Sequence, residues 1–228
     1  MVSMSRIVRR RGRRRVVRRS SRLSPAMDGY VPLQAAEIVS KLNFTPRWFI
    51  DCGPGDGREF DVFKERWPDL YVIGIEPSIS AFTSLQSRFP GILLNVAVSG
   101  REGRVRLLNP TSSLNASIIR SPDDYSGADG CQCVTLQTLD RIYGPNDAEY
   151  RRIENAFVWA DIEGSELAML DGAKEMIKNR QIRGFNLEVH DGENEQRTDT
   201  VMTGYGFSKI MSYQRNGFHH DNLYLDMR

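Results

Sequence analysis

The sequence predicts an α/β protein in which helices cover both faces of a mostly parallel sheet. Short apolar runs rich in β-branched and aromatic residues alternate along the chain with segments of helical periodicity, as they do in βαβ units. The first of these runs is followed by three glycines at alternate positions, Gly53, Gly55 and Gly57. Several runs end in a carboxylate, and ligands of open α/β sheets bind where the strands end. The chain is therefore expected to bind a ligand at that edge of its sheet.

The length of 228 residues suits one α/β domain with a sizeable core and one appended segment. No apolar run approaches the length of a membrane span, and no secretory signal is visible. The three cysteines, Cys52, Cys131 and Cys133, have neither the spacing of a disulfide framework nor that of a convincing zinc motif. We therefore expect a cytoplasmic protein with reduced thiols.

Residues 1–27 form an arginine-rich arm that precedes the predicted domain of residues 28–228. The arm contains ten arginines and no acid, which leaves the domain with 21 basic and 29 acidic residues, a net charge of −8. Such a composition predicts disorder of the arm in isolation. Three interpretations stay open: a solvated tail, a segment that binds a polyanion such as nucleic acid or an anionic surface, and a cleaved organelle-targeting peptide.

A helix is expected at 32–42, where apolar residues recur at helical spacing, and the first strand follows at 48–50. The glycine spacing after it, G-x-G-x-G, differs from the G-x-G-x-x-G loop that binds a pyrophosphate, which disfavours a dehydrogenase. Asp51 stands before the loop and Asp56 within it. The loop therefore favours a ligand with cationic groups and no phosphate, such as S-adenosylmethionine. The alternative is a strand-to-helix turn that binds nothing.

The helix after the loop is expected to end before Pro68, and a second strand follows at 70–76. It ends in Glu76, 25 positions after Asp51. An acid at this place can accept hydrogen bonds from both hydroxyls of a ribose. The alternative role for Glu76 is to cap the helix expected at 79–89.

The middle of the chain predicts a third strand at 91–98 and a β extension at 103–108. Residues 109–130 are rich in Ser, Asn, Asp, Pro and Gly and predict a long loop, and loops of this length are often functional lids. A short strand at 131–136 and a short helix at 138–143 follow.

The C-terminal part is expected to continue the alternation and to end in an antiparallel pair of strands. The expected elements are a strand at 156–163, a helix at 165–178, a strand at 184–190, a helix at 196–202, and strands at 207–211 and 223–227 with the turn residues Asn216-Gly217 between them. Asp51, Glu76, Asp161 and Glu188 then lie at the same edge of the sheet. Four acids at one edge are hard to explain by structural roles alone.

Several blocks of the sequence resemble the class I S-adenosylmethionine-dependent methyltransferases, and the FkbM-type subfamily in particular. The general blocks are Ile50-Asp51-Cys52-Gly53-x-Gly55-x-Gly57, Ile75-Glu76-Pro77 and Asn95-Val96-Ala97-Val98-Ser99. The FkbM-type blocks are Val134-Thr135-Leu136-x-x-Leu139-Asp140, Asp161-Ile162-Glu163-Gly164-x-Glu166-x-x-x-Leu170-x-Gly172-Ala173 and Glu188-Val189-His190. The resemblance runs from about Trp48 to Tyr224. Pro54 and Asp56 in the first loop and Trp159-Ala160 before the acid depart from the family pattern.

The resemblance implies a Rossmann-like class I methyltransferase fold, with a mostly parallel seven-stranded sheet and a terminal antiparallel hairpin. It also implies O-methylation of a hydroxyl, on an acceptor such as a sugar, a glycan or another small natural product. The residues expected to bind S-adenosylmethionine are Asp51, Gly53, Gly55, Asp56, Glu76, Pro77, Ala97, Val98 and Asp161.

The candidates for catalysis are Asp161, Glu163, Glu188 and His190. Because side chains at i and i+2 of a strand point the same way, each of the two pairs is expected to share a face. The set either includes a general base, with His190 closest to neutral by intrinsic pKa, or binds a divalent ion such as magnesium or manganese. No residue is assigned as a metal ligand. An RNA-directed methyltransferase that uses the arm and a non-catalytic binding module are the alternative functions.

Overall fold

The computed structural model describes residues 31–108, 117–118, 132–143, 153–190, 192–214 and 219–228. Its main sheet has seven strands in the order β10-β11-β9-β8-β1-β2-β3. The strands are parallel except β11, which is antiparallel to both of its neighbours. Their bounds are β1 (Trp48–Cys52), β2 (Tyr71–Ile75), β3 (Ile92–Leu94), β8 (Ala156–Ala160), β9 (Ile182–Val189), β10 (Phe207–Gln214) and β11 (His220–Asp226). The predicted Rossmann-like sheet with a terminal antiparallel hairpin is confirmed.

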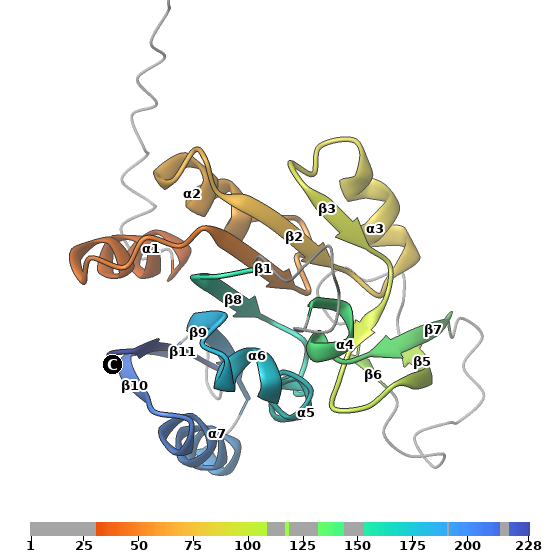
Figure 1. Ribbon diagram of the computed structural model, residues 1–228. Helices are drawn as coiled ribbons and strands as arrows, with labels where there is room; N and C mark the ends of the chain where they lie inside the picture. The colour runs from red at the N-terminus through yellow and green to blue at the C-terminus, as the bar shows by residue number, and fades with distance from the viewer. Residues whose placement is uncertain (1–30, 109–116, 119–131, 144–152, 191, 215–218) are drawn as a thin grey trace, which may run out of the picture.

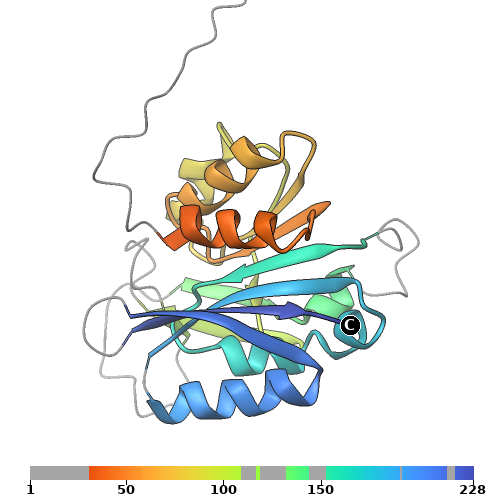
Figure 2. The ribbon, with the colours of Figure 1, turned by 90° about the vertical axis from the view of Figure 1, so that its left-hand side faces the viewer.

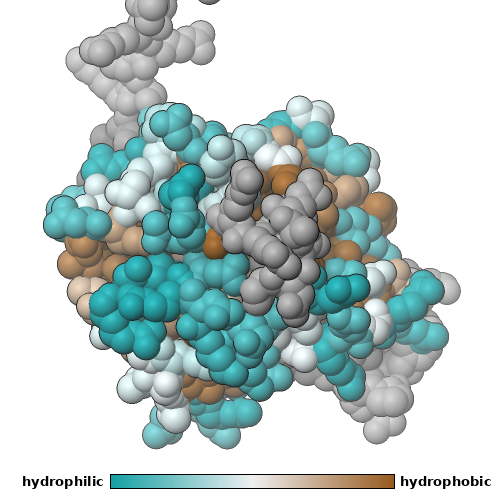
Figure 3. Space-filling view, viewed as in Figure 1, coloured by the Kyte–Doolittle hydropathy of each residue, from teal (hydrophilic) through white to brown (hydrophobic). Residues whose placement is uncertain are grey.

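Helices cover both faces of this sheet (Figures 1 and 2). One layer consists of α1 (Val31–Lys41), α2 (Arg58–Arg66) and α3 (Ile79–Gln86), and the other of α4 (Leu139–Tyr143), α5 (Glu166–Asp171), α6 (Lys174–Lys178) and α7 (Gly192–Gly204). Strand alternation creates the two cores, because Phe49 of β1 packs with the first layer and Ile50 and Cys52 with the second. Hydrophilic residues cover most of the surface on the side of α6 (Figure 3). None of the described helices is both long and apolar enough to cross a membrane.

A second sheet of four strands, in the order β4-β7-β5-β6, lies beside the main one (Figure 1). Its strands are β4 (Ala97–Val98), β5 (Gly103–Leu108), β6 (Ser117–Ile118) and β7 (Gln132–Gln137). The prediction of a single strand at 91–98 is therefore wrong. This segment forms two strands, of which β3 belongs to the main sheet and β4 to the second. Asn95 lies at the break, and its side-chain amide donates to the carbonyls of Glu76 and Pro77 at 2.8 and 3.0 Å. Apart from β6, the lid expected at 109–130 lies outside the described residues.

The single helix expected at 165–178 is also wrong, because two short helices, α5 and α6, occupy this region. Gly172 separates them and packs so closely on the Ser99 carbonyl that a Cβ would lie 2.1 Å from its oxygen. The Asp140 carboxylate accepts hydrogen bonds from two backbone N–H groups in the first turn of α6, both at 2.9 Å. A residue distant in the sequence thus caps α6. The apolar spacing, which is continuous over both helices, does not reveal this break.

The remaining predicted elements are present, with shifted ends. β8 ends at Ala160 rather than at Glu163, and α7 begins at Gly192 rather than at 196. β10 and β11 form the expected hairpin. Its predicted turn residues, Asn216-Gly217, lie outside the described residues, as does the arm at 1–27.

Candidate active site

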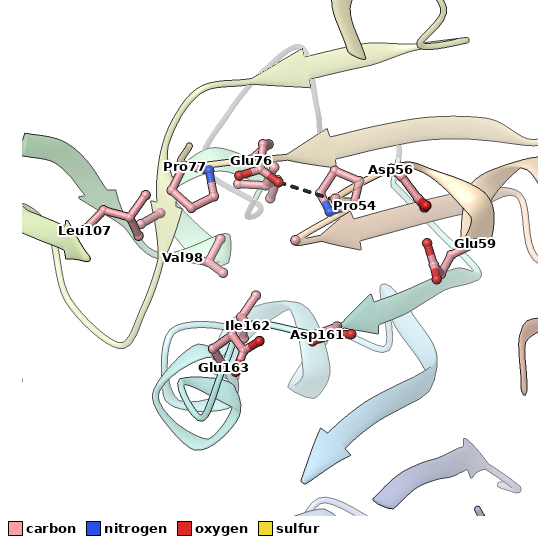
Figure 4. Close-up of a pocket in the computed structure, with 14 residues that line it drawn as sticks. Pro54, Asp56, Glu59, Glu76, Pro77, Val98, Leu107, Asp161, Ile162 and Glu163 are labelled. Atoms are coloured by element: carbon pink, nitrogen blue, oxygen red, sulfur yellow. Dashed lines mark hydrogen bonds between the residues drawn. The ribbon is translucent and has the colours of Figure 1, made fainter. Parts of the chain in front are cut away.

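An open cleft lies at the carboxyl edge of the main sheet and reaches the second sheet (Figure 4). Its empty volume is about 820 Å³, open solvent included. The predicted site residues that line it are Gly53, Gly55, Asp56, Glu76, Pro77, Ala97, Val98, Asp161 and Glu163. The lining residues that sequence reasoning missed are Pro54, Glu59, Ile75, Leu107 and Ile162.

The lining of the cleft is acidic. Five of its 14 described lining residues are carboxylic acids, and none is a lysine or an arginine. Figure 4 shows Asp56 and Glu59 at one end, with Glu76 and Asp161 on opposite walls. Asp56 pairs with a cation, since Arg58 Nε lies 2.6 Å from its Oδ2. Such a lining attracts cationic groups and repels phosphates, as the glycine spacing and acids of the first loop predict.

Glu76 joins the end of β2 to the glycine loop. It is 5% exposed. One carboxylate oxygen accepts from the backbone N–H of Ser78 at 2.8 Å and the other from that of Gly55 at 3.4 Å. Burial raises the pKa of Glu76 to about 7, against the opposing effect of these two hydrogen bonds. Ser78 is the N-cap of α3 and its side chain accepts from Ala81 N, so one oxygen of Glu76 also helps to cap α3 by accepting from the backbone N–H of Ser78.

The three loop glycines have the positive φ angles that favour glycine: 82° at Gly53, 50° at Gly55 and 74° at Gly57. A Cβ at Gly53 would lie 2.1 Å from the carbonyl oxygen of Asp161. The backbone of Gly53 therefore packs closely against the backbone of Asp161 on the opposite wall of the cleft. Packing of the protein on itself, and not only approach to a ligand, requires glycine here.

Asp51, predicted to bind the cofactor, lies at the end of β1 behind the loop and does not line the cleft. It is 0% exposed, and neither carboxylate oxygen has a hydrogen-bond partner among the described residues. Burial, reinforced by the charges of Glu59 and Glu76, raises the pKa of Asp51 well above its usual range. The Asp51 side chain therefore does not contact the cleft directly, and the glycine loop that follows it lies between the two.

The turn after β8 forms the wall opposite Glu76. Glu163 in this turn has a φ of 53°, which is uncommon for a residue other than glycine. The expectation that strand alternation gives Asp161 and Glu163 a shared face is wrong, because the strand ends before them. Both nevertheless line the cleft. Glu166, which the sequence motif contained without an assigned role, accepts from two backbone N–H groups of the turn at 3.2 and 3.1 Å and so stabilises it.

Glu188 and His190 lie close together, as predicted, but they do not line the cleft. Glu188 is 4% exposed, and its Oε2 lies 3.5 Å from His190 Nε2. His219, which sequence reasoning missed, brings its Nδ1 to 3.4 Å from Glu188 Oε1. Glu163 connects this group to the cleft, since its Oε2 lies 3.7 Å from His190 Nε2. Burial raises the pKa of Glu163.

The family model of the methyltransferase FkbM domain matches residues 51–220 of this chain. The chain belongs to the FkbM methyltransferase family. The matched range contains every described residue that lines the cleft, together with Glu188, His190 and His219. No curated protein matches the sequence.

Solved methyltransferase structures are similar to this FkbM domain at low identity and with TM-scores below 0.5. A human methyltransferase 10 domain containing protein has 12% identity and a TM-score of 0.46, over 86% of this chain and 80% of the other. The 1,6-didemethyltoxoflavin-N1-methyltransferase of Burkholderia thailandensis, solved with S-adenosylhomocysteine, has 12% identity and a TM-score of 0.45, over 88% and 79%. A putative RNA methyltransferase of Pyrococcus horikoshii has 9% identity and a TM-score of 0.46, over 86% and 81%. Nothing about the substrate follows from likenesses at this level.

Three residues of the FkbM domain reach the site from outside the predicted motifs, and the first is Glu59, just after the glycine loop. Leu107 belongs to the second sheet, and no motif in its local sequence predicts that it lines the cleft. His219 had a usable signal, because it precedes the predicted last strand and the chain contains only three histidines. The antiparallel pairing of β11 with β9, Val189 opposite His220, brings it beside Glu188.

Proposed function

We propose that this FkbM domain binds S-adenosylmethionine in the acidic cleft and methylates a hydroxyl group of a small molecule or glycan. The observation that carries the proposal is the lining of the cleft, which lies at the carboxyl edge of a methyltransferase fold and presents carboxylates and no described lysine or arginine. A dinucleotide would bring two phosphates into this negative lining. S-adenosylmethionine brings a sulfonium and an ammonium group instead, and no phosphate.

The residues of the cleft fit this cofactor. Glu76 is a buried acid at the end of the second strand, where it can accept hydrogen bonds from ribose hydroxyls. Val98, Leu107 and Ile162 supply apolar surface for an adenine ring. Asp56 and the backbone of the glycine loop are assigned to the amino-acid part of the cofactor. When bound, S-adenosylmethionine supplies a methyl group that an acceptor oxygen takes as the carbon–sulfur bond breaks and its electron pair stays on sulfur.

Asp161 is proposed to take the proton that the acceptor hydroxyl loses. It lines the cleft on the wall opposite Glu76 (Figure 4). Its backbone is tightly located, since Asp161 N donates to the carbonyl of Cys52 at 3.1 Å and its own carbonyl packs against Gly53. A carboxylate carried by a fixed backbone next to the acceptor supports both orientation and proton removal. Glu163, Glu188 and His190 are assigned to the acceptor side of the site.

The charge of the cleft favours a neutral or cationic acceptor. A nucleic acid would have to bring phosphates to an acidic lining, which costs free energy because none of the described lining residues is a lysine or an arginine. The acceptor is therefore proposed to be a hydroxyl-bearing small molecule or glycan rather than RNA.

The test is a methyl-transfer assay on the full-length protein with methyl-labelled S-adenosylmethionine and pools of hydroxyl-bearing small molecules, glycans and RNA. We expect label in a small-molecule or glycan pool, and calorimetric binding of S-adenosylhomocysteine but not of NAD. Label confined to RNA would overturn the acceptor assignment. Tight NAD binding without binding of S-adenosylhomocysteine would overturn the cofactor assignment.

The Asp161→Asn variant tests the assignment of the proton acceptor. We expect the single-turnover rate to fall by about 10²–10⁴-fold, while the melting temperature and the affinity for S-adenosylhomocysteine stay near those of the wild type. Asp171→Asn, the same change at an exposed position of α5, is the matched control and should leave the rate unchanged. A normal rate in Asp161→Asn would mean that another group accepts the proton.

A further inference from the structure

We propose that Glu188, His190 and His219 form a binding site for a divalent transition-metal ion of the zinc class, beside the cleft. One ligand atom from each of these three side chains lies within 4.8 Å of the other two. The existence of the site does not depend on the proposed methyl transfer. Its role on the acceptor side does rest on that proposed function.

The sheet topology assembles this site from two ends of strands. Glu188 and His190 come from the end of β9, and His219 directly precedes β11. The antiparallel register pairs Glu188 with Asp221 and Val189 with His220, so His219 lies near the end of β9. The chain has three histidines, at positions 190, 219 and 220. This register brings all three to the same end of the β9–β11 pair.

Two nitrogen-to-oxygen distances in this group are close to those between the ligands of a small divalent ion. His190 Nε2 is 3.5 Å from one oxygen of Glu188, and His219 Nδ1 is 3.4 Å from the other. A tetrahedral zinc ion with bonds of about 2.0–2.1 Å keeps its ligand atoms about 3.3–3.4 Å apart. The rings of the two histidines are tilted by 50° with their centroids 4.5 Å apart.

This group is buried at Glu188 and partly exposed at the two histidines, since the His190 and His219 side chains are 25% and 45% exposed. The Glu188 side chain is 6% exposed. His190 Nε2 is buried and makes no hydrogen bond of acceptable geometry within the described part of the chain. A buried nitrogen without such a bond, aimed at a buried carboxylate, is costly unless a further partner is present. A bound cation would be such a partner for His190 Nε2.

The ligand types select the class of ion. The sequence motifs had brought together carboxylates and a single histidine, which favoured magnesium or manganese. With His219 the set becomes two imidazoles and one carboxylate, which suits zinc, cobalt or iron better than magnesium. The remaining coordination positions are open to Glu163, whose Oε2 is 3.7 Å from His190 Nε2, or to a ligand in the cleft.

The position next to Glu163 gives the ion a chemical role. Glu163 lines the cleft, so an acceptor hydroxyl that enters it lies close to the metal site. A hydroxyl oxygen bound to the ion loses its proton more readily, because the positive charge stabilises the alkoxide. The metal would therefore act as a Lewis acid on the acceptor, and Asp161 would take the released proton.

The test measures metal binding directly on the full-length protein, with any affinity tag removed. After treatment with a chelator and its removal by dialysis, zinc chloride is titrated by calorimetry, and cobalt(II) is added to record its visible absorption. We expect one ion per chain and a cobalt spectrum with nitrogen ligands. His190→Ala and His219→Ala should each weaken zinc binding at least ~10-fold, since even a lost partner of a ligand typically costs that much.

His220→Ala is the matched control, because Nδ1 of His220 lies 3.8 Å from Glu195 instead. It should leave zinc affinity unchanged. Absence of stoichiometric binding, or equal binding by wild type and His219→Ala, would overturn the site and leave Glu188 with the histidines as an ion-paired group. Glu188→Gln, which keeps the shape of the side chain, should also weaken binding and covers the case in which a histidine variant does not fold. A parallel titration with S-adenosylhomocysteine reports on the cofactor site separately.

Discussion

Glu76 should make the stability of the ligand-free protein depend on pH, and Glu76→Gln should remove that dependence. Burial raises the pKa of this carboxyl from 4.5 to about 7 in the folded protein. In the unfolded chain the same group has its ordinary value. Between these two pKa values the folded protein binds a proton that the unfolded chain has released, so the contribution of Glu76 to stability is greatest below pH 4.5 and decreases as the pH rises toward 7.

The size of the effect follows from the two pKa values. A difference of about 2.5 pH units corresponds to about 3.4 kcal/mol of unfolding free energy between low and high pH, at 1.36 kcal/mol per unit. Part of this change occurs below pH 5, which leaves about 2.5 kcal/mol between pH 5 and pH 8. The loss ends near pH 7, because above that value both states carry the ionised group.

The assay is urea unfolding of wild type and Glu76→Gln without cofactor at pH 5, 6, 7 and 8. The variant should gain stability relative to the wild type by about 2.5 kcal/mol from pH 5 to pH 8. Titratable groups that both proteins share cancel in this difference. The charge of Glu76 is the smallest of the three causes that raise the pKa of Asp51, so the substitution changes that pKa little. Glu65→Gln, at an exposed position of α2, controls for the loss of one surface charge. A difference between Glu76→Gln and wild type that stays constant with pH would refute the reasoning.

Two further predictions concern the framework of the site. Gly53→Ala should lower the free energy of unfolding by more than about 1 kcal/mol, because φ is 82° and the new Cβ would lie 2.1 Å from the Asp161 carbonyl oxygen. Gly204→Ala, where nothing lies within 4 Å of the added Cβ, is its control, and equal melting temperatures for the two variants would contradict the prediction. Asp140→Ala should cost about 1 kcal/mol, because its carboxylate accepts from two backbone N–H groups at the start of α6. Unchanged urea midpoints would show that water replaces this cap.

The sequence by itself determined the order of elements and the chemistry of the cleft edge. Alternation of short apolar runs with helical segments predicted the parallel sheet, because strand and helix periodicity are local properties of the chain. The spacing of the three glycines and the acid at position 76 predicted a ligand site at the ends of β1 and β2, where the cleft lies. These signals need only neighbouring residues, since a tight turn and an acid at the end of a strand are encoded within a few positions.

The tertiary structure decided which of those residues meet. Asp51 and Glu76 both end strands, yet Asp51 is enclosed behind the loop and Glu76 lines the cleft. Leu107 reaches the site because β5 belongs to a separate sheet, and His219 joins Glu188 because β11 pairs with β9. Such contacts depend on strand order and register between segments far apart in the chain. Local periodicity shows that a strand exists and which residues alternate along it, but the burial of two apolar cores selects its neighbours.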